Sequence, residues 1–381
     1  MHFGRALPAS LAVLAAAAAV VMSARETHGQ IPPSVEFRVP KTPTVAVTDS
    51  GTILGYELFV TNLTSAPLTL RRVEVLSAAG KVLATLADAD SSLQRATSRV
   101  TQIPAAERLK LDGGARATVY LWVLVDRANP PAQLRHRLTL QRDSATTEVL
   151  EGTTIPVERA AIAIGAPVRG EWAAFNGPSN ASGHRRLVLA LDGHTASGQR
   201  FAIDFLQVDS AGGSRRPGTD AAKNSNYYAY GTELLAVADG VIAATKDSIP
   251  ENVPGGRAVK IDLTTVGGNF VGIDIGGGKY ALYAHVQPGS LRVKVGDRVK
   301  RGQVIALLGN SGNSTEPHVH FQIADGPSFL AAEGLPYATD FDVLGNCGIG
   351  GNPPKITCTR HAPTAVKGGI PIQNELVRFP K

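Results

Sequence analysis

The sequence is poor in several residue types that would point to common classes of protein. Its 381 residues include only two cysteines, which form no close Cys-x-x-Cys pair, so a cysteine-built zinc site is a poor interpretation. No internal repeat and no long amphipathic helical stretch is evident. Forty glycines and 24 prolines instead indicate many turns, which suits an all-β architecture.

Aromatic residues are also scarce, at 6% of the chain, and no aromatic stacking motif accompanies the scattered basic residues. We therefore expect no nucleic-acid partner. The net charge of +6 suits a surface that meets anionic polymers, such as cell-wall glycans and their attached acids.

The chain has a single long apolar run, at residues 7–22, which follows one arginine and precedes small residues. This pattern predicts a secretory signal peptide over residues 1–29. An uncleaved anchor is the weaker alternative, because the run is short of the roughly 20 residues that a membrane span needs. No cysteine near the cleavage point offers a lipid attachment. We expect a secreted or periplasmic protein of the cell envelope, with no membrane span after cleavage.

Two histidines, His318 and His320, are two residues apart in a run that reads as a β-strand. Because side chains alternate along a strand, both imidazoles are expected on one face, with Val319, Phe321 and Ile323 facing a core. Neutral imidazole is the commonest nitrogen ligand of zinc, so the pair is half of a metal site. Taken alone, the pair is also compatible with surface residues of an edge strand.

Further candidate residues lie upstream of this pair. His285 ends a strand-like run at 277–285, and Asp204 lies in another such run at 201–205. Glycines and alternating valines at 293–312 indicate short strands joined by tight turns. Three histidines and one aspartate would converge if these strands pack in one sheet.

These segments resemble the lysostaphin-type zinc metalloendopeptidases, which cleave peptidoglycan cross-links. The similarity covers about residues 174–337, under half of the chain. The matching blocks, in order, are Tyr230-Gly231-Thr232, residues 237–242, residues 283–286, residues 295–297 with Gly302-Gln303, residues 309–312 and residues 318–321.

The resemblance implies a role for each matching residue. His320 would bind zinc, and Asp204 would be the carboxylate ligand. His318 would sit beside the metal-activated water, with His285 as its partner, so these two would be the catalytic residues. The implied substrate is peptidoglycan and the implied cofactor is Zn²⁺, although cobalt or nickel suit the same donors.

One position departs from the family pattern. The family has a histidine four residues before the aspartate, whereas this chain has Arg200 there, and arginine has no lone pair for a metal. On a strand, Arg200 would share a face with Asp204, where it would pair with that carboxylate or hold a carboxylate of the substrate. We expect His184 to replace the missing ligand, carried back to the site by a strand at 187–191, with His194 as the alternative. If neither does, the domain is a degenerate relative that binds cell wall or activates another hydrolase.

The rest of the chain predicts a two-domain protein. Irregularly spaced strand-like runs at residues 31–158 are typical of an immunoglobulin-like β-sandwich without the antibody-type cysteine pair. It holds no catalytic cluster, and it is a candidate surface for a protein partner. The expected fold is thus all-β, with this sandwich before a lysostaphin-type antiparallel sheet at 174–337 and an extension at 338–381.

The two cysteines, Cys347 and Cys358, both fall in the extension. An exported chain meets an oxidising compartment, so we expect a disulfide that closes a small loop around residues 348–354. A competing interpretation is that residues 295–309 form a lipoyl- or biotinyl-carrier turn. It is weak, because Lys300 lacks the setting of a modified lysine and the histidines would have no role.

Overall fold

Strands dominate the part of the chain that the structure describes, and the prediction of an all-β fold is confirmed. The structure is a computed structural model that describes residues 35–99, 103–143, 146–351 and 355–380. The predicted signal peptide, residues 1–29, lies outside the described residues. Residues 35–381 form one compact unit. Within the described residues, no helix is both long and apolar enough to cross a membrane.

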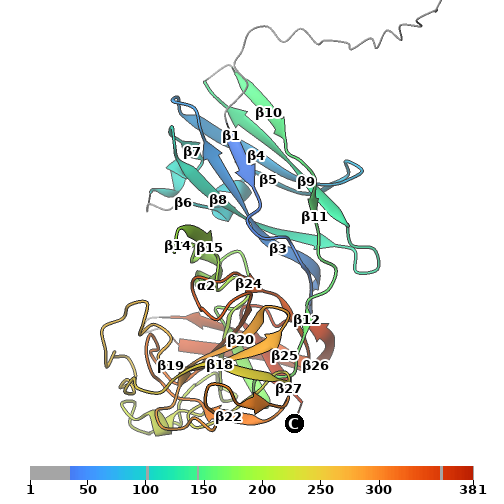
Figure 1. The fold of residues 1–381 in the computed structure, drawn as a ribbon. Coiled ribbons are helices and arrows are strands. Elements are labelled where there is room, and N and C mark those ends of the chain that lie inside the picture. The colour runs from blue at the N-terminus through green and yellow to red at the C-terminus, as the bar shows by residue number, and fades with distance from the viewer. Residues whose placement is uncertain (1–34, 100–102, 144–145, 352–354, 381) are drawn as a thin grey trace, which may run out of the picture. The chain divides into compact units, whose positions relative to one another are not determined.

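Two antiparallel sheets form the first half of this unit (Figure 1, blue to green). They coincide with the strand-like runs that the alternating sequence pattern predicts. One sheet has the order β1-β3-β8-β6 with β2 on β3, and the other has the order β10-β9-β4-β5 with β7 on β4 and β11 on β9. The strands are β1 (Val35–Arg38), β2 (Val45–Thr48), β3 (Gly51–Asn62), β4 (Leu68–Ser77), β5 (Val82–Ala87), β6 (Thr97–Arg99), β7 (Lys110–Leu111), β8 (Arg116–Val125), β9 (Gln133–Gln141), β10 (Thr147–Glu151) and β11 (Ile155–Pro156).

One apolar core joins these two sheets, which makes them a β-sandwich as predicted. Alternating residues of β3 and β8 in one sheet pack with residues of β4 and β9 in the other, as the period of two along a strand requires. The buried members include Leu54, Tyr56, Leu58, Val119, Leu121, Val123, Leu70, Val73, Leu138 and Leu140.

A third sheet, of twelve strands, carries the candidate site. Its order is β12-β25-β27-β13-β16-β23-β20-β19-β18-β21, with β24 on β23 and β26 on β25. Every pair is antiparallel except β12 with β25. The strands are β12 (Ile162–Ala163), β13 (Gly170–Phe175), β16 (Ile203–Leu206), β18 (Gly240–Lys246), β19 (Asn269–Gly276), β20 (Lys279–Val286), β21 (Arg298–Val299), β23 (Val319–Ala324), β24 (Gly334–Leu335), β25 (Tyr337–Gly350), β26 (Lys355–Gly369) and β27 (Glu375–Phe379).

Strand β23 shows why the sequence folds in this way around the histidines. Val319, Phe321 and Ile323 are fully buried in the main core cluster, as predicted. The intervening residues His320 and Gln322 take the opposite face of the strand. Neighbouring strands β16 and β20 flank β23 on either side, so the chain places Asp204 and His285 close to the histidine pair.

The C-terminal strands belong to the same sheet as the site strands. Residues predicted as an extension form β25, β26 and β27, and β27 pairs directly with β13. The Cys347–Cys358 disulfide is confirmed, and the two cysteines are directly opposite in the β25–β26 register. The expected loop is wrong for residues 348–350, because β25 continues through them as strand.

The remaining elements are short. Two-stranded sheets pair β14 (Leu189–Leu191) with β15 (His194–Ala196) and β17 (Glu233–Leu235) with β22 (Val304–Leu307). The helical pieces are α1 (Ser92–Ala96), α2 (Gly183–Arg186), η1 (Ala105–Glu107) and η2 (Asn224–Asn226).

Candidate metal centre

The centre is built on a cross-strand pair. Asp204 on β16 lies directly opposite His320 on β23, and such partners project from the same face of a sheet. The Nδ1 atom of His320 is 3.0 Å from Oδ1 of Asp204. The other neighbour of His320, on β20, is Ala284, whose small side chain leaves space beside the imidazole. Both members of the pair are buried.

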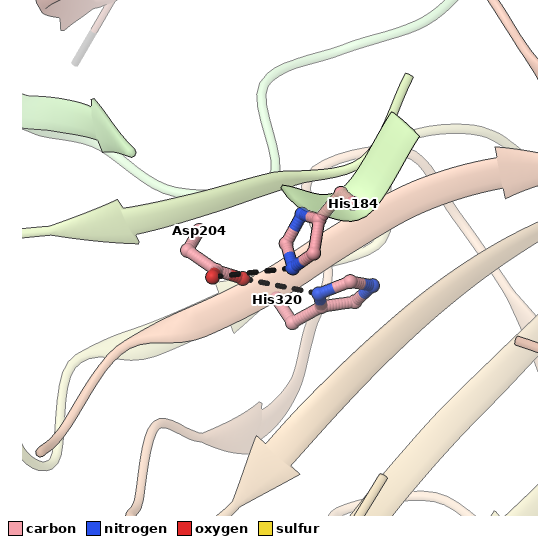
Figure 2. A group of neighbouring side chains, drawn as sticks. All are labelled: His184, Asp204 and His320. Atoms are coloured by element: carbon pink, nitrogen blue, oxygen red, sulfur yellow. Dashed lines mark hydrogen bonds and ion pairs between the residues drawn. The ribbon is translucent and has the colours of Figure 1, made fainter. Parts of the chain in front are cut away.

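The helical turn α2 brings a third donor to this pair. Nε2 of His184 is 3.4 Å from Oδ2 of Asp204. Figure 2 shows the His184 and His320 rings both facing the Asp204 carboxylate, with a dashed line for each contact. One possible ligand atom from each of His184, Asp204 and His320 lies within 4.8 Å of the other two. The expectation that a strand carries His184 is wrong: His184 lies on α2, and the following strand β14 pairs with β15. His194 is exposed, with Nε2 3.1 Å from the carbonyl oxygen of Ala331, and it is not part of this group.

Gln322 determines which nitrogen of His320 carries the proton. The Gln322 amide nitrogen donates to the carbonyl oxygens of Gly198 and Phe329, at 2.9 and 3.3 Å, so its oxygen faces His320. That oxygen lies 2.8 Å from Nε2 of His320 and can only accept, so Nε2 carries the hydrogen. In the neutral imidazole, Nδ1 then carries no hydrogen, and its lone pair points toward the Asp204 carboxylate.

The donor atoms of this group fit a bound metal ion. A lone pair on His320 and a carboxylate oxygen of Asp204 face each other at 3.0 Å, which is unfavourable unless a cation or an added proton lies between them. Two imidazole nitrogens and a carboxylate are the donors that zinc prefers. The opposite carboxylate oxygen, Oδ2, accepts a hydrogen bond from Asn176 at 2.8 Å, which orients the group. The donor set fits zinc.

The protonation states also fit a metal site. Burial lowers the pKa of His184 to about 4, although Asp204 opposes this shift, so the imidazole is neutral at pH 7. Burial alone would raise the pKa of Asp204, but the neighbouring imidazoles of His184, His318 and His320 hold it well below its usual range. A neutral imidazole and an ionised carboxylate are the forms that bind metal.

Two further histidines present free nitrogens to the same space. Nδ1 of His318 donates to the carbonyl oxygen of Glu316 at 2.8 Å, and Nδ1 of His285 donates to that of Ser311 at 2.8 Å. Because carbonyl oxygens only accept, both Nε2 atoms are unprotonated in the neutral rings. The ring centroids are 4.7 Å apart. His318 also approaches the metal group, with Nε2 3.6 Å from Oδ1 of Asp204.

His285 has a strained backbone that its surroundings impose. Its φ is +65°, a left-handed conformation that non-glycine residues seldom adopt. The carbonyl of Ser311 that fixes its ring belongs to the Gly309–Gly312 turn. In that turn Gly312 has φ +73°, and a side chain there would collide with the backbone of Gly268. Burial lowers the pKa of His285 well below its usual range.

The five predicted site residues all line one open cleft of about 360 Å³. Its wall includes the basic residue Arg257, whose guanidinium is held by Asn313 and by the carbonyl oxygen of Ser314. Apolar wall residues Phe329 and Leu330 continue into a neighbouring hollow of about 310 Å³. The complete lining is Asn176, Gly183, His184, Leu187, Gln199, Asp204, Arg257, Val266, Gly267, Ala284, His285, Asn313, Thr315, His318, His320, Phe329 and Leu330.

The predicted position of Arg200 is wrong. β16 begins only at Ile203, so Arg200 lies in a turn and does not share a strand face with Asp204. Its guanidinium is buried and bonds to Glu57, at 2.6 Å, and to Glu333, at 2.6 Å. It therefore neither pairs with Asp204 nor reaches the cleft.

Residues that support the site were missed at the level of sequence. Gln322 had a usable signal, because it continues the alternation of His318 and His320 on one strand face. Asn176 and Glu57 had none, since they meet Asp204 and Arg200 through contacts 28 and 143 residues apart in the chain.

Comparison with known proteins tests the predicted resemblance. Residues 218–330 match Peptidase family M23. Over this segment, the predicted resemblance to lysostaphin-type peptidases is confirmed. The matched residues include His285, His318 and His320, whereas His184 and Asp204 precede them.

Individual relatives match over short segments. The chain is 33% identical over 129 residues to peptidoglycan DD-endopeptidase ShyC of Vibrio cholerae, covering 32% of this chain and 26% of that protein. It is 35% identical over 83 residues to murein hydrolase activator EnvC of Escherichia coli, covering 22% and 19%. A similar solved structure is the catalytic domain of the antimicrobial peptidase lysostaphin from Staphylococcus simulans, with 24% identity, coverage of 43% and 86%, and a TM-score of 0.24. The first curated relatives are matched over only 18% to 26% of their own length.

Proposed function

We propose that the protein is an exported zinc metalloendopeptidase that cleaves peptide bonds in peptidoglycan. The observation that carries this proposal is the convergence of His184, Asp204 and His320, whose ligand atoms lie within 4.8 Å of one another. In this proposal these three residues hold the ion through a nitrogen of His184, a carboxylate oxygen of Asp204 and Nδ1 of His320.

A bound zinc ion supplies a Lewis acid that makes water a nucleophile near neutral pH and polarises a carbonyl group. The chain's own histidines supply the proton transfers. His318 and His285 each present an unprotonated Nε2 to the cleft, so either can accept a proton from water and pass it to the leaving amine. The backbone carbonyls at their Nδ1 atoms hold the rings in this tautomer and stabilise the protonated form.

Peptidoglycan is the proposed substrate for two reasons. The M23 match and the name of the ShyC relative support a cell-wall peptide, and the basic surface suits an anionic polymer. The cleft opens to solvent, as a polymeric substrate requires. Export through residues 1–29, to the periplasm or the medium, is part of the same proposal, as is the division into a sandwich at 31–158 and a peptidase domain at 174–337.

A second candidate function is a cell-wall binding protein that activates another hydrolase. The EnvC relative and the replacement of the family histidine by Arg200 favour it. The two functions differ in whether the protein itself cuts a peptide bond.

Digestion of purified peptidoglycan separates the two candidates. We expect the parent to release soluble fragments with new amino termini, and Asp204→Asn to release none, because that variant removes the ligand charge. His194→Ala is the matched control, since His194 is an exposed histidine outside the cleft, and it should retain full activity. A parent that holds zinc and releases no fragments, yet accelerates a second hydrolase, would contradict the peptidase and support the activator.

A further inference from the structure

The residue next to the proposed ligand His184 is anchored in the N-terminal sandwich. Arg185 is only 1% exposed, and its guanidinium donates to the backbone carbonyls of Tyr56 and Leu121, at 2.9 and 2.8 Å. It also donates to Oε1 of Glu57 at 3.2 Å. All three acceptors belong to β3 and β8, strands of the sandwich.

Glu57 holds a second arginine with its other oxygen. Oε2 accepts a hydrogen bond at 2.6 Å from Nε of Arg200, the residue that stands where the family has a metal ligand. Glu57 is 1% exposed, so it is a buried carboxylate shared by two buried guanidinium groups. Arg200 also pairs with Glu333 at 2.6 Å, which balances the cluster at two positive and two negative charges.

Aromatic residues of β8 complete the anchor. The guanidinium carbon of Arg185 lies 5.7 Å from the ring centroid of Tyr120 and 5.6 Å from that of Trp122. The Tyr120 hydroxyl donates to the carbonyl oxygen of Arg186 at 3.3 Å, at the end of the same helical turn. The sandwich therefore contacts the turn both through the Arg185 side chain and through its backbone.

The turn α2 has little means of holding its own shape. It is four residues long, and Ser182 at its N-cap makes no side-chain capping bond. A single turn of helix is unstable in isolation, because nucleation orders several residues for one hydrogen bond. The position of His184 thus depends on contacts outside the turn, and those that Arg185 makes with Glu57 and with the carbonyls of Tyr56 and Leu121 are all buried.

We propose that Glu57 is a positioning residue for the metal centre: through Arg185 it sets the place of His184, so the N-terminal sandwich forms part of the metal site's scaffold. The proposal rests on the proposed function for the identity of His184 as a ligand. It assigns Arg200 a structural role in place of a ligand role, as the second arm of the Glu57 cluster.

The test uses the full chain with Glu57→Gln and Arg185→Met. The first variant keeps the shape of the side chain but removes its charge. The second removes only the arm to His184 and leaves the Glu57–Arg200 pair in place, so it is the variant to use if Glu57→Gln does not fold. Glu74→Gln is the matched control, because Glu74 is also a buried sandwich glutamate that pairs with two arginines, Arg72 and Arg137, and none of these contacts α2.

Two readouts are compared. Zinc affinity, from competition with a chelator, should fall about 10–100-fold in Glu57→Gln and Arg185→Met and remain unchanged in Glu74→Gln. Amide hydrogen exchange in the metal-free protein should be at least tenfold faster across residues 182–187 in the two test variants only.

The outcomes separate this inference from the proposed function. A parent that binds no zinc, with faster exchange at 182–187 in the test variants, would refute the zinc peptidase and retain the anchor. Zinc affinity and exchange that match the parent in a folded Arg185→Met variant would overturn the positioning role of Glu57. Equal losses in Glu74→Gln would also overturn it, because the effect would then be general destabilisation of the sandwich.

Discussion

Gln322 offers the sharpest perturbation of the metal centre without removal of a ligand. Its amide oxygen accepts from Nε2 of His320, which leaves Nδ1 as the lone pair that faces Asp204. Gln322→Leu removes this acceptor, so His320 loses the partner that selects its tautomer. Gln322→Glu keeps an acceptor at the same place. Both variants remove the amide donor that bonds to the carbonyl oxygens of Gly198 and Phe329.

The expected magnitudes follow from these contacts. Buried carbonyls that lose a donor cost about 1–3 kcal/mol each, so both variants should lower the free energy of unfolding. Gln322→Glu should lower it further, because it buries a carboxylate beside those carbonyl oxygens. Loss of an outer-shell partner of a metal-ligating histidine typically weakens metal binding ~10–100-fold, or about 1.4–2.7 kcal/mol. Only Gln322→Leu should show that second loss.

The assay is zinc affinity by chelator competition, with urea unfolding of the metal-free proteins as the stability measurement. We expect weaker zinc binding in Gln322→Leu than in Gln322→Glu, although Gln322→Glu is the less stable protein. Parent-like zinc affinity in Gln322→Leu would refute the tautomer reasoning. Equal weakening in both variants would refute it as well, because the common loss of the amide donor would then explain the effect.

Three further predictions concern stability. His136 is buried against the Tyr56 hydroxyl, and burial lowers its pKa to about 4, whereas the same side chain in the unfolded chain has a pKa near 6.5. Because the unfolded state binds the proton first, the free energy of unfolding should fall by up to about 3 kcal/mol as pH drops from 6.5 to 4. Urea unfolding measures this fall, and His136→Gln should reduce it. Burial raises the pKa of Glu375 to about 9, so this residue makes the pH dependence of stability run in the opposite direction. The folded state keeps the proton that the unfolded chain releases, so the free energy of unfolding should fall as pH rises from 4.5 to 9, at up to ~1.4 kcal/mol per pH unit. Glu375→Gln should remove that fall. Cys347→Ser with Cys358→Ser should lower the free energy of unfolding by about 2–3 kcal/mol, and an unchanged urea midpoint would contradict the loop-closure estimate.

Local alternation made much of this fold predictable. The strands around His318, His285 and Asp204 read directly from side chains that alternate between core and cleft, a pattern that a single strand contains in full. The sandwich strands β3 and β8 read in the same way. The histidine pair also marked one face of β23, and with it the position of Gln322.

Arg200 shows where local reasoning fails. The rule that residues four apart share a face holds only inside a strand, and a turn separates Arg200 from β16. Its partner Glu57 lies 143 residues earlier, on a strand whose pattern gives no hint of a buried charge cluster. Likewise, His184 lies on a short helical turn that is held by contacts with residues distant in the chain, so no periodicity in the sequence predicts that it lies near Asp204. Its role as a ligand was predicted only because the site lacked one histidine.

The C-terminal strands illustrate the same limit. Residues 375–379 read as a strand, but one of its two partner strands is β13, some 200 residues away in the chain. Pairing between segments so far apart depends on the whole sheet, and the alternation within one strand carries no information about it.

The central claim is that His184, Asp204 and His320 hold one zinc ion. The most direct test is the zinc content of the purified protein, of His184→Ala and His320→Ala, and of His194→Ala as the control. The account predicts one zinc per chain in the parent and in His194→Ala, and none in the other two. A parent without zinc, or a His184→Ala variant that retains it with the parent's affinity, would contradict the account.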